Sequence, residues 1–158
     1  MKKTLLILPA FALILILSGC GQANQGKVTA INVANNYNAA QELNRDMNDP
    51  NKISSEDNVE NIYTIMNYQG DESKETVKAA IRKGIEDGKD QSGLDKELIK
   101  ASAANNNGLG TGYMLGYVFG CKAVTGDEDK CNDDMSKKYQ EIMMEEMQKE
   151  FQGMTATQ

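Results

Sequence analysis

The sequence predicts a mainly α-helical protein, a small bundle of about five short helices clipped by one disulfide behind a flexible N-terminal tether. Apolar residues recur at helical spacing along most of the chain, and no run of alternating residues is long enough to indicate a strand. Two cysteines, Cys121 and Cys131, lie close enough in the sequence for a bond between them to close a short loop. These features predict a helical domain over residues 32–153, followed by a disordered tail over 154–158.

Residues 1–19 have the composition of a secretion signal. Two lysines follow Met1, and residues 4–17 are almost entirely leucine, isoleucine, alanine and phenylalanine, interrupted by Pro9. A helix over this run is about 21 Å long, short of the ~30 Å hydrocarbon core of a bilayer. We therefore expect the segment to be cleaved rather than kept as a membrane anchor.

The apolar run ends in Leu17, Ser18, Gly19 and Cys20. This tetrapeptide resembles the lipobox of bacterial lipoproteins, in which small residues enter the site of the signal peptidase and the cysteine thiol is acylated. The resemblance implies that Cys20 is the first residue of the mature protein and carries a diacylglyceryl thioether, with an additional N-acyl chain in most Gram-negative bacteria. We expect no other cofactor.

The expected lipid modification indicates where in the cell the protein acts. Two or three acyl chains hold a protein stably at a membrane, whereas one binds only marginally. By analogy with enterobacterial sorting, Gly21 after the lipidated cysteine implies the periplasmic face of the outer membrane, with the cytoplasmic membrane as the alternative. Residues 21–27 are small, polar and interrupted by glycine, as is typical of a flexible tether, and we expect the lipidated cysteine and its tether to span residues 20–31.

The composition argues against several classes of function. Without Lys2 and Lys3, 15 of the 17 basic residues oppose all 23 acidic ones, so the mature chain has a net charge of about −8. A basic surface for nucleic acid is therefore not expected. The chain has no histidine, which removes the usual base of serine and cysteine hydrolases and the commonest ligand of catalytic zinc.

Four helices are predicted before residue 105. The first runs from residue 32 to the Asp49-Pro50 stop, and the second covers the stretch from Ser54 to just before Gly70. The third spans residues 73–87 and the fourth 94–104. The expected inward residues of the first helix are Val33, Tyr37, Ala40 and Met47, and those of the second are Val59, Ile62, Tyr63 and Met66. Those of the third are Val77, Ile81 and Ile85, with Ala80, Gly84 and Gly88 beside them. Those of the fourth are Leu98 and Ala101, with Ser102 and Ala104 as further candidates.

The fifth segment carries Gly108, Gly112, Gly116 and Gly120, which fall on nearly one line of a helix. Each interior glycine disfavours a helix by about 1 kcal/mol, so the repeat indicates a purpose. One interpretation is an interaction face that enters a membrane or drives self-association. The other is a central helix packed closely against the Ala80, Gly84 and Gly88 face.

Cys121 and Cys131 predict a disulfide bond that stabilises the domain. With Cys20 committed to lipid, Cys121 and Cys131 are an even pair in an exported chain, and a disulfide between them would stabilise the domain by roughly 2.5–3 kcal/mol. Acidic residues crowd around Cys131, but their order does not match a calcium-binding loop. We interpret them as a solvated turn and a helix N-cap, with no metal site.

A last helix over residues 133–152, capped by Gly153, carries an apolar stripe of Met135, Tyr139, Ile142, Met143, Met147 and Phe151. A methionine-rich stripe forms either part of a core or an adaptable binding surface. The sequence leaves both interpretations open.

These features favour a non-catalytic envelope protein that acts by binding an unidentified envelope protein. The layout of tether, helices and late disulfide resembles that of the pilotins that escort secretins and of plasmid entry-exclusion lipoproteins, although no motif beyond residues 17–20 carries that resemblance. One alternative is a self-assembling structural component of the envelope. Another is a hydrolase that uses neighbouring carboxylates, such as Glu86 with Asp87 or Asp133 with Asp134.

Overall fold

The computed structural model describes residues 30–102 and 107–155, and the regular secondary structure in these ranges is entirely α-helical. The prediction of a mainly helical protein is confirmed. The described ranges contain six helices rather than about five: α2 (Ala30–Asp46), α3 (Glu56–Met66), α4 (Lys74–Lys89), α5 (Lys96–Ser102), α6 (Gly108–Thr125) and α7 (Glu128–Thr155). The predicted signal and lipobox, and the tether up to residue 29, lie outside the described residues.

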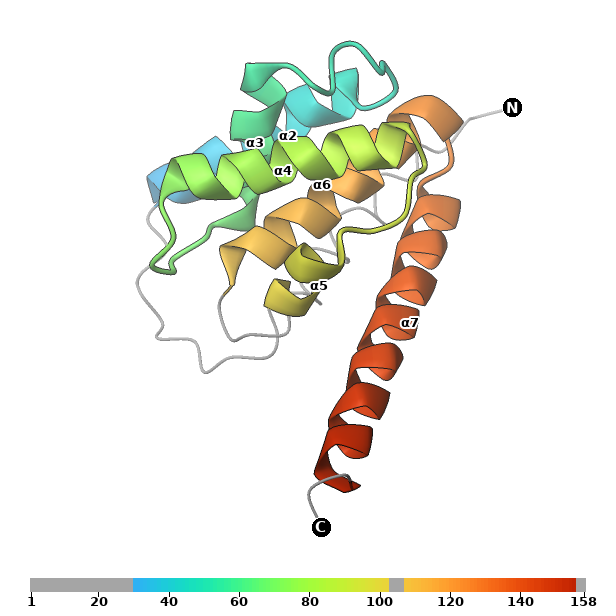
Figure 1. Ribbon diagram of the computed structural model, residues 1–158. Helices are drawn as coiled ribbons and strands as arrows, with labels where there is room; N and C mark the ends of the chain where they lie inside the picture. Colours follow the sequence, from blue (N-terminus) through green and yellow to red (C-terminus); the bar gives the residue numbers. More distant parts are fainter. Residues whose placement is uncertain (1–29, 103–106, 156–158) are drawn as a thin grey trace, which may run out of the picture.

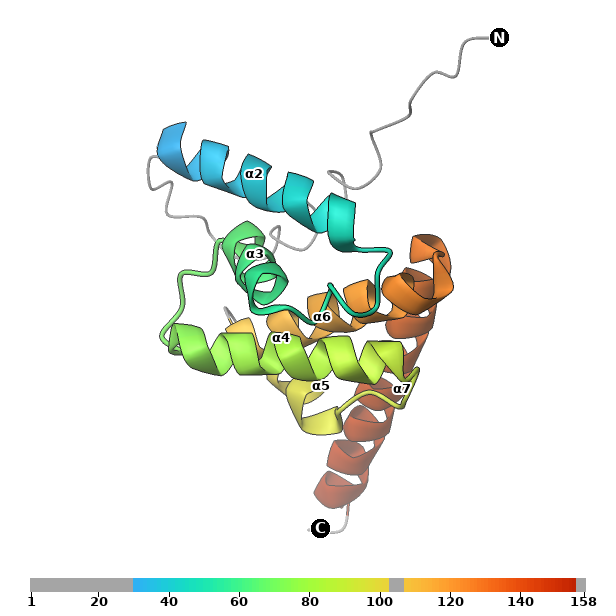
Figure 2. The same ribbon diagram turned by 90° about the horizontal axis from the view of Figure 1, so that it is seen from above.

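The helices are arranged in layers around α4 and α6, which lie side by side at the centre (Figures 1 and 2). The pair α2 and α3 covers one side, and its core cluster includes Leu43, Ile62 and Ile81. On the other side α5 and α7 pack on a second cluster that includes Ile99 and Tyr117. The central pair therefore contributes to both clusters.

Two predicted helix faces differ from those observed. The buried apolar residues are Ala39 and Leu43 in α2 and Met47 directly after it, whereas Tyr37 is 54% exposed. Spaced by four, the three buried residues form one continuous stripe towards α3, and this stripe turns Tyr37 outward. In α5 the fully buried residue is Ile99, which the prediction did not include.

The last helix is longer than predicted at both ends. It begins at Glu128 instead of residue 133, and it continues through Gly153, the predicted cap, to Thr155. Of the predicted tail, residues 154 and 155 are therefore helical, and 156–158 lie outside the described residues. At 28 residues, α7 is also much longer than the short helices that the sequence predicted.

A buried lysine joins α3 to α4. The Lys78 side chain is only 7% exposed, and its ammonium pairs with Glu56 and, at 3.2 Å, with Glu60. The hydrogen bond to Glu56 is the largest cause of a raised pKa at Lys78. The pKa of Glu56 is lowered, chiefly by Lys78, and that of Glu60 is lowered, chiefly by Lys74. All three shifts favour the charged forms.

Replacing Lys78 by methionine is expected to lower the melting temperature by several degrees, because it leaves two carboxylates beside a buried apolar side chain. The matched control is Lys74→Met, which removes a 48% exposed partner of Glu60 and is expected to change little. The pKa values of Glu56 and Glu60 are lowered in the folded protein, so the stabilisation is fully present above their unfolded pKa of about 4.3 and is lost as the pH falls from there through the lowered folded values. Thermal unfolding of the wild type and both variants at pH 7 and pH 3 measures the stability that these ion pairs contribute. Equal losses in both variants at pH 7 would contradict the prediction.

Candidate interaction surface

Four of the five glycines of α6, those of the predicted repeat, face α4 inside the protein. A Cβ atom on Gly116 or Gly120 would overlap the backbone carbonyl oxygen of Ile81 or Ile85. A Cβ on Gly112 would lie 3.0 Å from the Ile81 side chain, and one on Gly108 would lie 2.8 Å from the ring of Tyr68. This corrects the interpretation of Gly108, Gly112, Gly116 and Gly120 as an interaction face, because α4 already covers them.

The close approach is reciprocal, which explains why both helices carry small residues. On α4, a Cβ on Gly84 would overlap the carbonyl oxygen of Tyr113, and one on Gly88 that of Tyr117. Backbone therefore meets backbone along the contact, as the alternative interpretation of the repeat predicts. The missing side chains give the two helices room to approach, and this contact compensates for the low helix propensity of glycine.

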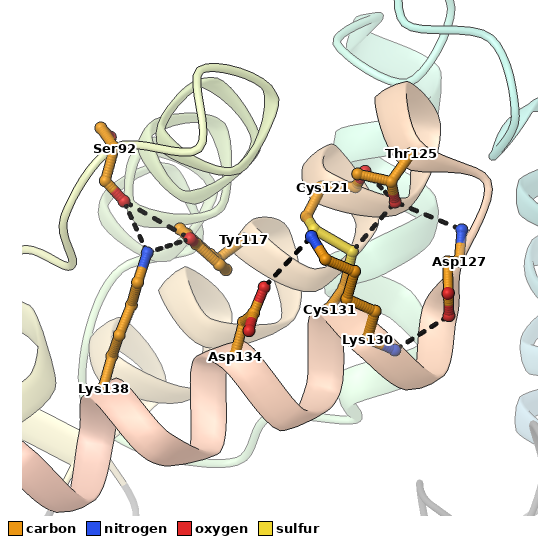
Figure 3. Close-up of a disulfide and its surroundings, with 9 residues drawn as sticks. All are labelled: Ser92, Tyr117, Cys121, Thr125, Asp127, Lys130, Cys131, Asp134 and Lys138. Atoms are coloured by element: carbon orange, nitrogen blue, oxygen red, sulfur yellow. Dashed lines mark hydrogen bonds and ion pairs between the residues drawn. A yellow bond between two sulfur atoms is a disulfide. The ribbon is translucent and has the colours of Figure 1, made fainter.

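The predicted disulfide between Cys121 and Cys131 is confirmed and joins the end of α6 to the start of α7 (Figure 3). Both residues are buried and lie within helices, with their Cα atoms 5.8 Å apart. The connection between the helices is only residues 126 and 127. Gly126 makes it possible with a φ of 71°, and its N–H donates to the carbonyl oxygen of Lys122 at 2.8 Å.

The acidic residues around Cys131 have helix-terminal and ion-pairing roles. The Asp127 carboxylate accepts from the Lys130 N–H at 2.9 Å, and the Lys130 ammonium pairs with Asp134 at 3.4 Å (Figure 3). Within residues 30–102 and 107–155, no three metal-binding side chains come together.

Polar contacts fix the direction of α7 after the disulfide. The Lys138 ammonium donates to the hydroxyl oxygen of Tyr117 at 2.7 Å and to the carbonyl oxygen of Ser92 at 3.1 Å (Figure 3). Further along, two ion pairs attach α7 to α5. They are Lys96 with Glu145 at 2.6 Å and Lys100 with Glu146 at 3.3 Å.

The predicted methionine stripe of α7 divides into a buried and an exposed part. Ile142 is 7% exposed, and Met135, Tyr139 and Met143 also pack against the second core cluster. In contrast, Met147 is 51% exposed and Phe151 is 67% exposed. The core interpretation therefore holds only for the first part of the stripe, because α7 projects beyond the rest of the bundle (Figure 1).

Met144, which the predicted stripe did not include, is 55% exposed. It lies three residues before Met147 and seven before Phe151, so the three side chains share one face of α7. We call Met144, Met147 and Phe151 the distal stripe. Large apolar side chains at other positions of the described surface are scattered, as with Tyr37 on α2 and Val124 on α6.

The carboxylates considered for hydrolysis do not converge. Glu86 accepts from the Ser54 hydroxyl at 2.8 Å, whereas Asp87 accepts from the Tyr113 hydroxyl at 2.8 Å and pairs with Lys83. In the second pair, Asp133 is exposed and Asp134 is bound by Lys130. The neighbouring members of each pair thus have different surroundings, as expected for adjacent residues on a helix.

Tyr113 is a buried polar residue that sequence reasoning missed. Besides donating to Asp87, its hydroxyl oxygen accepts from the Asp95 N–H at 2.8 Å, so it ties α6 to the start of α5. Burial is the main cause of a pKa far above the ordinary tyrosine value. The hydroxyl therefore stays protonated and serves as a structural link. Because Tyr113 and Asp87 lie 26 residues apart in the sequence, no local pattern indicated that they pair.

None of the helices in the described ranges has both the length and the apolar character required to cross a bilayer. No protein-family model matches the chain, and no curated protein or solved structure shows significant similarity to it.

Proposed function

We propose that the chain is a membrane-anchored bacterial lipoprotein that acts as a non-catalytic interaction protein of the cell envelope, with the distal stripe as its contact surface. The signal and lipobox at residues 1–20 support the anchor and the location. The observation that carries the contact surface is the exposure of Met144, Met147 and Phe151 together on one face of a projecting helix.

The chemistry of the distal stripe favours binding. Burying a fully exposed Met or Phe side chain is worth roughly 1.5–3 kcal/mol. These three side chains are 51–67% exposed, so covering them together provides somewhat more than half of that value for each. Contiguous exposed apolar residues are typical of interaction sites, whereas single ones are common on any surface. Two of the three are methionines, whose flexible thioethers adapt to the shape of a partner.

The arrangement of the molecule suits a tethered binding protein. The first residues of α2 and the far end of α7 lie at separate extremes of the structure in both ribbon views (Figures 1 and 2). The tether would precede α2. A lipid on Cys20 would therefore hold the bundle from one end, while the distal stripe is carried at another.

The anchor is tested by comparing the wild-type chain with Cys20→Ser in intact cells, using metabolic labelling with an alkyne fatty acid and membrane fractionation. We expect the wild type to be labelled and recovered with membranes, and the variant to lose the label and at least 90% of membrane association. Chemical crosslinking and pull-down then report the partner. We expect a discrete adduct with the wild type and at least tenfold less with the variant.

Each part of the proposal has its own contrary result. Equal labelling and membrane recovery of the two chains would show that Cys20 is not lipidated, which removes the proposed class and location. A lipidated protein that yields no adduct would retain the anchor and lose the interaction role. Deletion of the gene tests the pilotin-like version, which predicts that a secretin is no longer assembled correctly. Conjugation assays test the exclusion-like version, which predicts that recipient cells with the protein take up the related plasmid less often.

A further inference from the structure

We propose that a polar hollow beside α2 and α3 binds a neutral sugar in its pyranose form. The hollow has a volume of about 260 Å³ and is lined by residues of both helices and of the segment that follows α3. Pockets for drug-sized ligands measure ~300–1,000 Å³, so this one suits a single sugar ring. The hollow is remote from the far end of α7 (Figures 1 and 2), and the inference does not depend on the contact surface proposed above.

The hollow is lined mainly by uncharged side chains that both donate and accept hydrogen bonds. Asn36 lies on α2 and Thr64 on α3, whereas Asn67 and Gln69 follow α3. Three of these side chains are amides and one is an alcohol, so each offers a donor as well as an acceptor. The hydroxyl groups of a sugar also donate and accept, and several of them on one ring match this set of partners.

Two aromatic rings supply the apolar part of the hollow. Tyr63 and Tyr68 are half-buried, and both pack against the first core cluster. The Tyr68 ring is held in place, because Gly70 and Gly108 approach it so closely that a Cβ on either would clash with it. Its hydroxyl oxygen also accepts from the Glu72 N–H at 3.5 Å. The C–H groups of a pyranose ring carry slight positive charge, which suits the negative faces of such rings.

The charge of Glu60, which also lines the hollow, is already neutralised within the protein. Its carboxylate pairs with the Lys74 ammonium at 2.6 Å and with that of Lys78 at 3.2 Å. The Lys74 ammonium also lies 5.4 Å from the centre of the Tyr63 ring. A cationic ligand would therefore compete with a lysine for both the carboxylate and the ring. An anionic ligand would meet the Glu60 carboxylate on a protein with more acidic than basic residues. These charges favour a neutral ligand.

The backbone of Asn67 forms the turn that brings the last lining residues to the hollow. With a φ of 47° it ends α3 in the left-handed region, and its N–H donates to the carbonyl oxygen of Thr64 at 3.1 Å. The Gln69 amide then donates to the Asn67 side-chain oxygen at 3.4 Å, so the two amides lie together. Both side chains are exposed. Glycine adopts a positive φ without strain, so Asn67→Gly removes an amide and preserves the turn.

Titration of the purified protein with two disaccharides, observed by NMR in a detergent without sugar groups, tests the proposal. Diacetylchitobiose and cellobiose have the same rings and linkage and differ in their N-acetyl groups, so they distinguish an amino sugar of the cell-wall type from a simple hexose. We expect at least one of them to shift the side-chain amide signals of Asn67 and Gln69 saturably, with a Kd on the order of 1 mM. The signals of Gln140, an exposed amide on α7, should not move.

A double variant, Asn67→Gly/Gln69→Leu, removes two of the amides from the hollow. We expect it to fold as the wild type does and to bind the sugar about tenfold more weakly, because two hydrogen bonds are lost. The Thr64 methyl signal reports binding in the wild type and the variant alike. The matched control is Gln140→Leu, which removes an exposed amide elsewhere and should leave the affinity unchanged.

The outcomes separate the source of the sugar from the existence of the site. Tighter binding of diacetylchitobiose supports a cell-wall glycan as the ligand, and equal or tighter binding of cellobiose supports recognition of the pyranose ring itself. No saturable shift at about 20 mM of either sugar, roughly twenty times the expected Kd, would overturn the proposal. Wild-type affinity in the double variant would also overturn it, as would tighter binding of tetramethylammonium than of either sugar. Each of these failures leaves the lipid anchor and the distal stripe untouched.

Discussion

Replacing Gly120 by alanine is expected to destabilise the protein by about 3 kcal/mol or more, enough to unfold a marginally stable domain. In an ordinary helix interior the same change would stabilise by about 1 kcal/mol, because alanine favours helix more than glycine does. Here the added methyl would overlap the carbonyl oxygen of Ile85. That atom belongs to the backbone of α4 and cannot move without separating the two central helices.

Two other glycines of the chain provide matched controls. A Cβ on Gly93 meets nothing within 4 Å, so Gly93→Ala is expected to change stability by less than ~0.5 kcal/mol. Gly112→Ala brings its methyl to 3.0 Å from the Ile81 side chain, which can adjust, and should have an intermediate effect. Urea unfolding followed by circular dichroism measures all three. Equal stability of Gly120→Ala and Gly93→Ala would show that α4 and α6 do not approach as closely as described.

Removal of the disulfide is expected to have the second largest effect on stability. The Cys121→Ala/Cys131→Ala chain should lose about 2.7 kcal/mol, because the unfolded chain is no longer held in a loop with a sequence separation of 10. For a domain of this size the loss corresponds to a melting temperature lower by roughly 10 °C. Both cysteines are buried, so the mutant also loses sulfur packing between α6 and α7.

Thermal unfolding of the double mutant and the wild type, with and without reductant, measures the contribution of the disulfide. The wild type in reductant strong enough to reduce the unfolded chain should approach the double mutant. Cys20→Ser is the control for loss of an unrelated cysteine and should keep the wild-type dependence on reductant. A double mutant that melts within 2 °C of the oxidised wild type would contradict a stabilising role for this bond.

The helical segments could be predicted from sequence because they have strong local signals. Ser73 was expected to begin the third helix, and its hydroxyl oxygen accepts from the Thr76 N–H at 3.2 Å as the N-cap of α4. Val77, Ile81 and Ile85, spaced by four, are all fully buried. The glycine repeat also predicted a close helix contact as one of two interpretations, since few other roles explain glycine at that spacing.

The limits of the prediction arise from tertiary structure. A stripe such as Met135 to Phe151 shows which face of a helix is apolar, but it does not show where the neighbouring helices stop. The bundle covers Ile142 and leaves Met147 and Phe151 exposed, so one sequence pattern has two structural roles. Lys78 was missed for a similar reason, because only the packing of α3 on α4 buries it beside Glu56 and Glu60.

The central claim is that the distal stripe is the contact surface of a membrane-tethered protein, and site-specific photocrosslinking tests it most directly. One strain carries a benzophenone amino acid in place of Met147, and a second strain carries it in place of Tyr37, which is exposed on α2. Each strain is compared with a version that also has the Cys20→Ser substitution. Our account predicts that the crosslinker at position 147 gives a discrete adduct that depends on Cys20. The crosslinker at position 37 is expected to give a several-fold lower yield. No adduct at 147, or equal adducts from both positions, would contradict it.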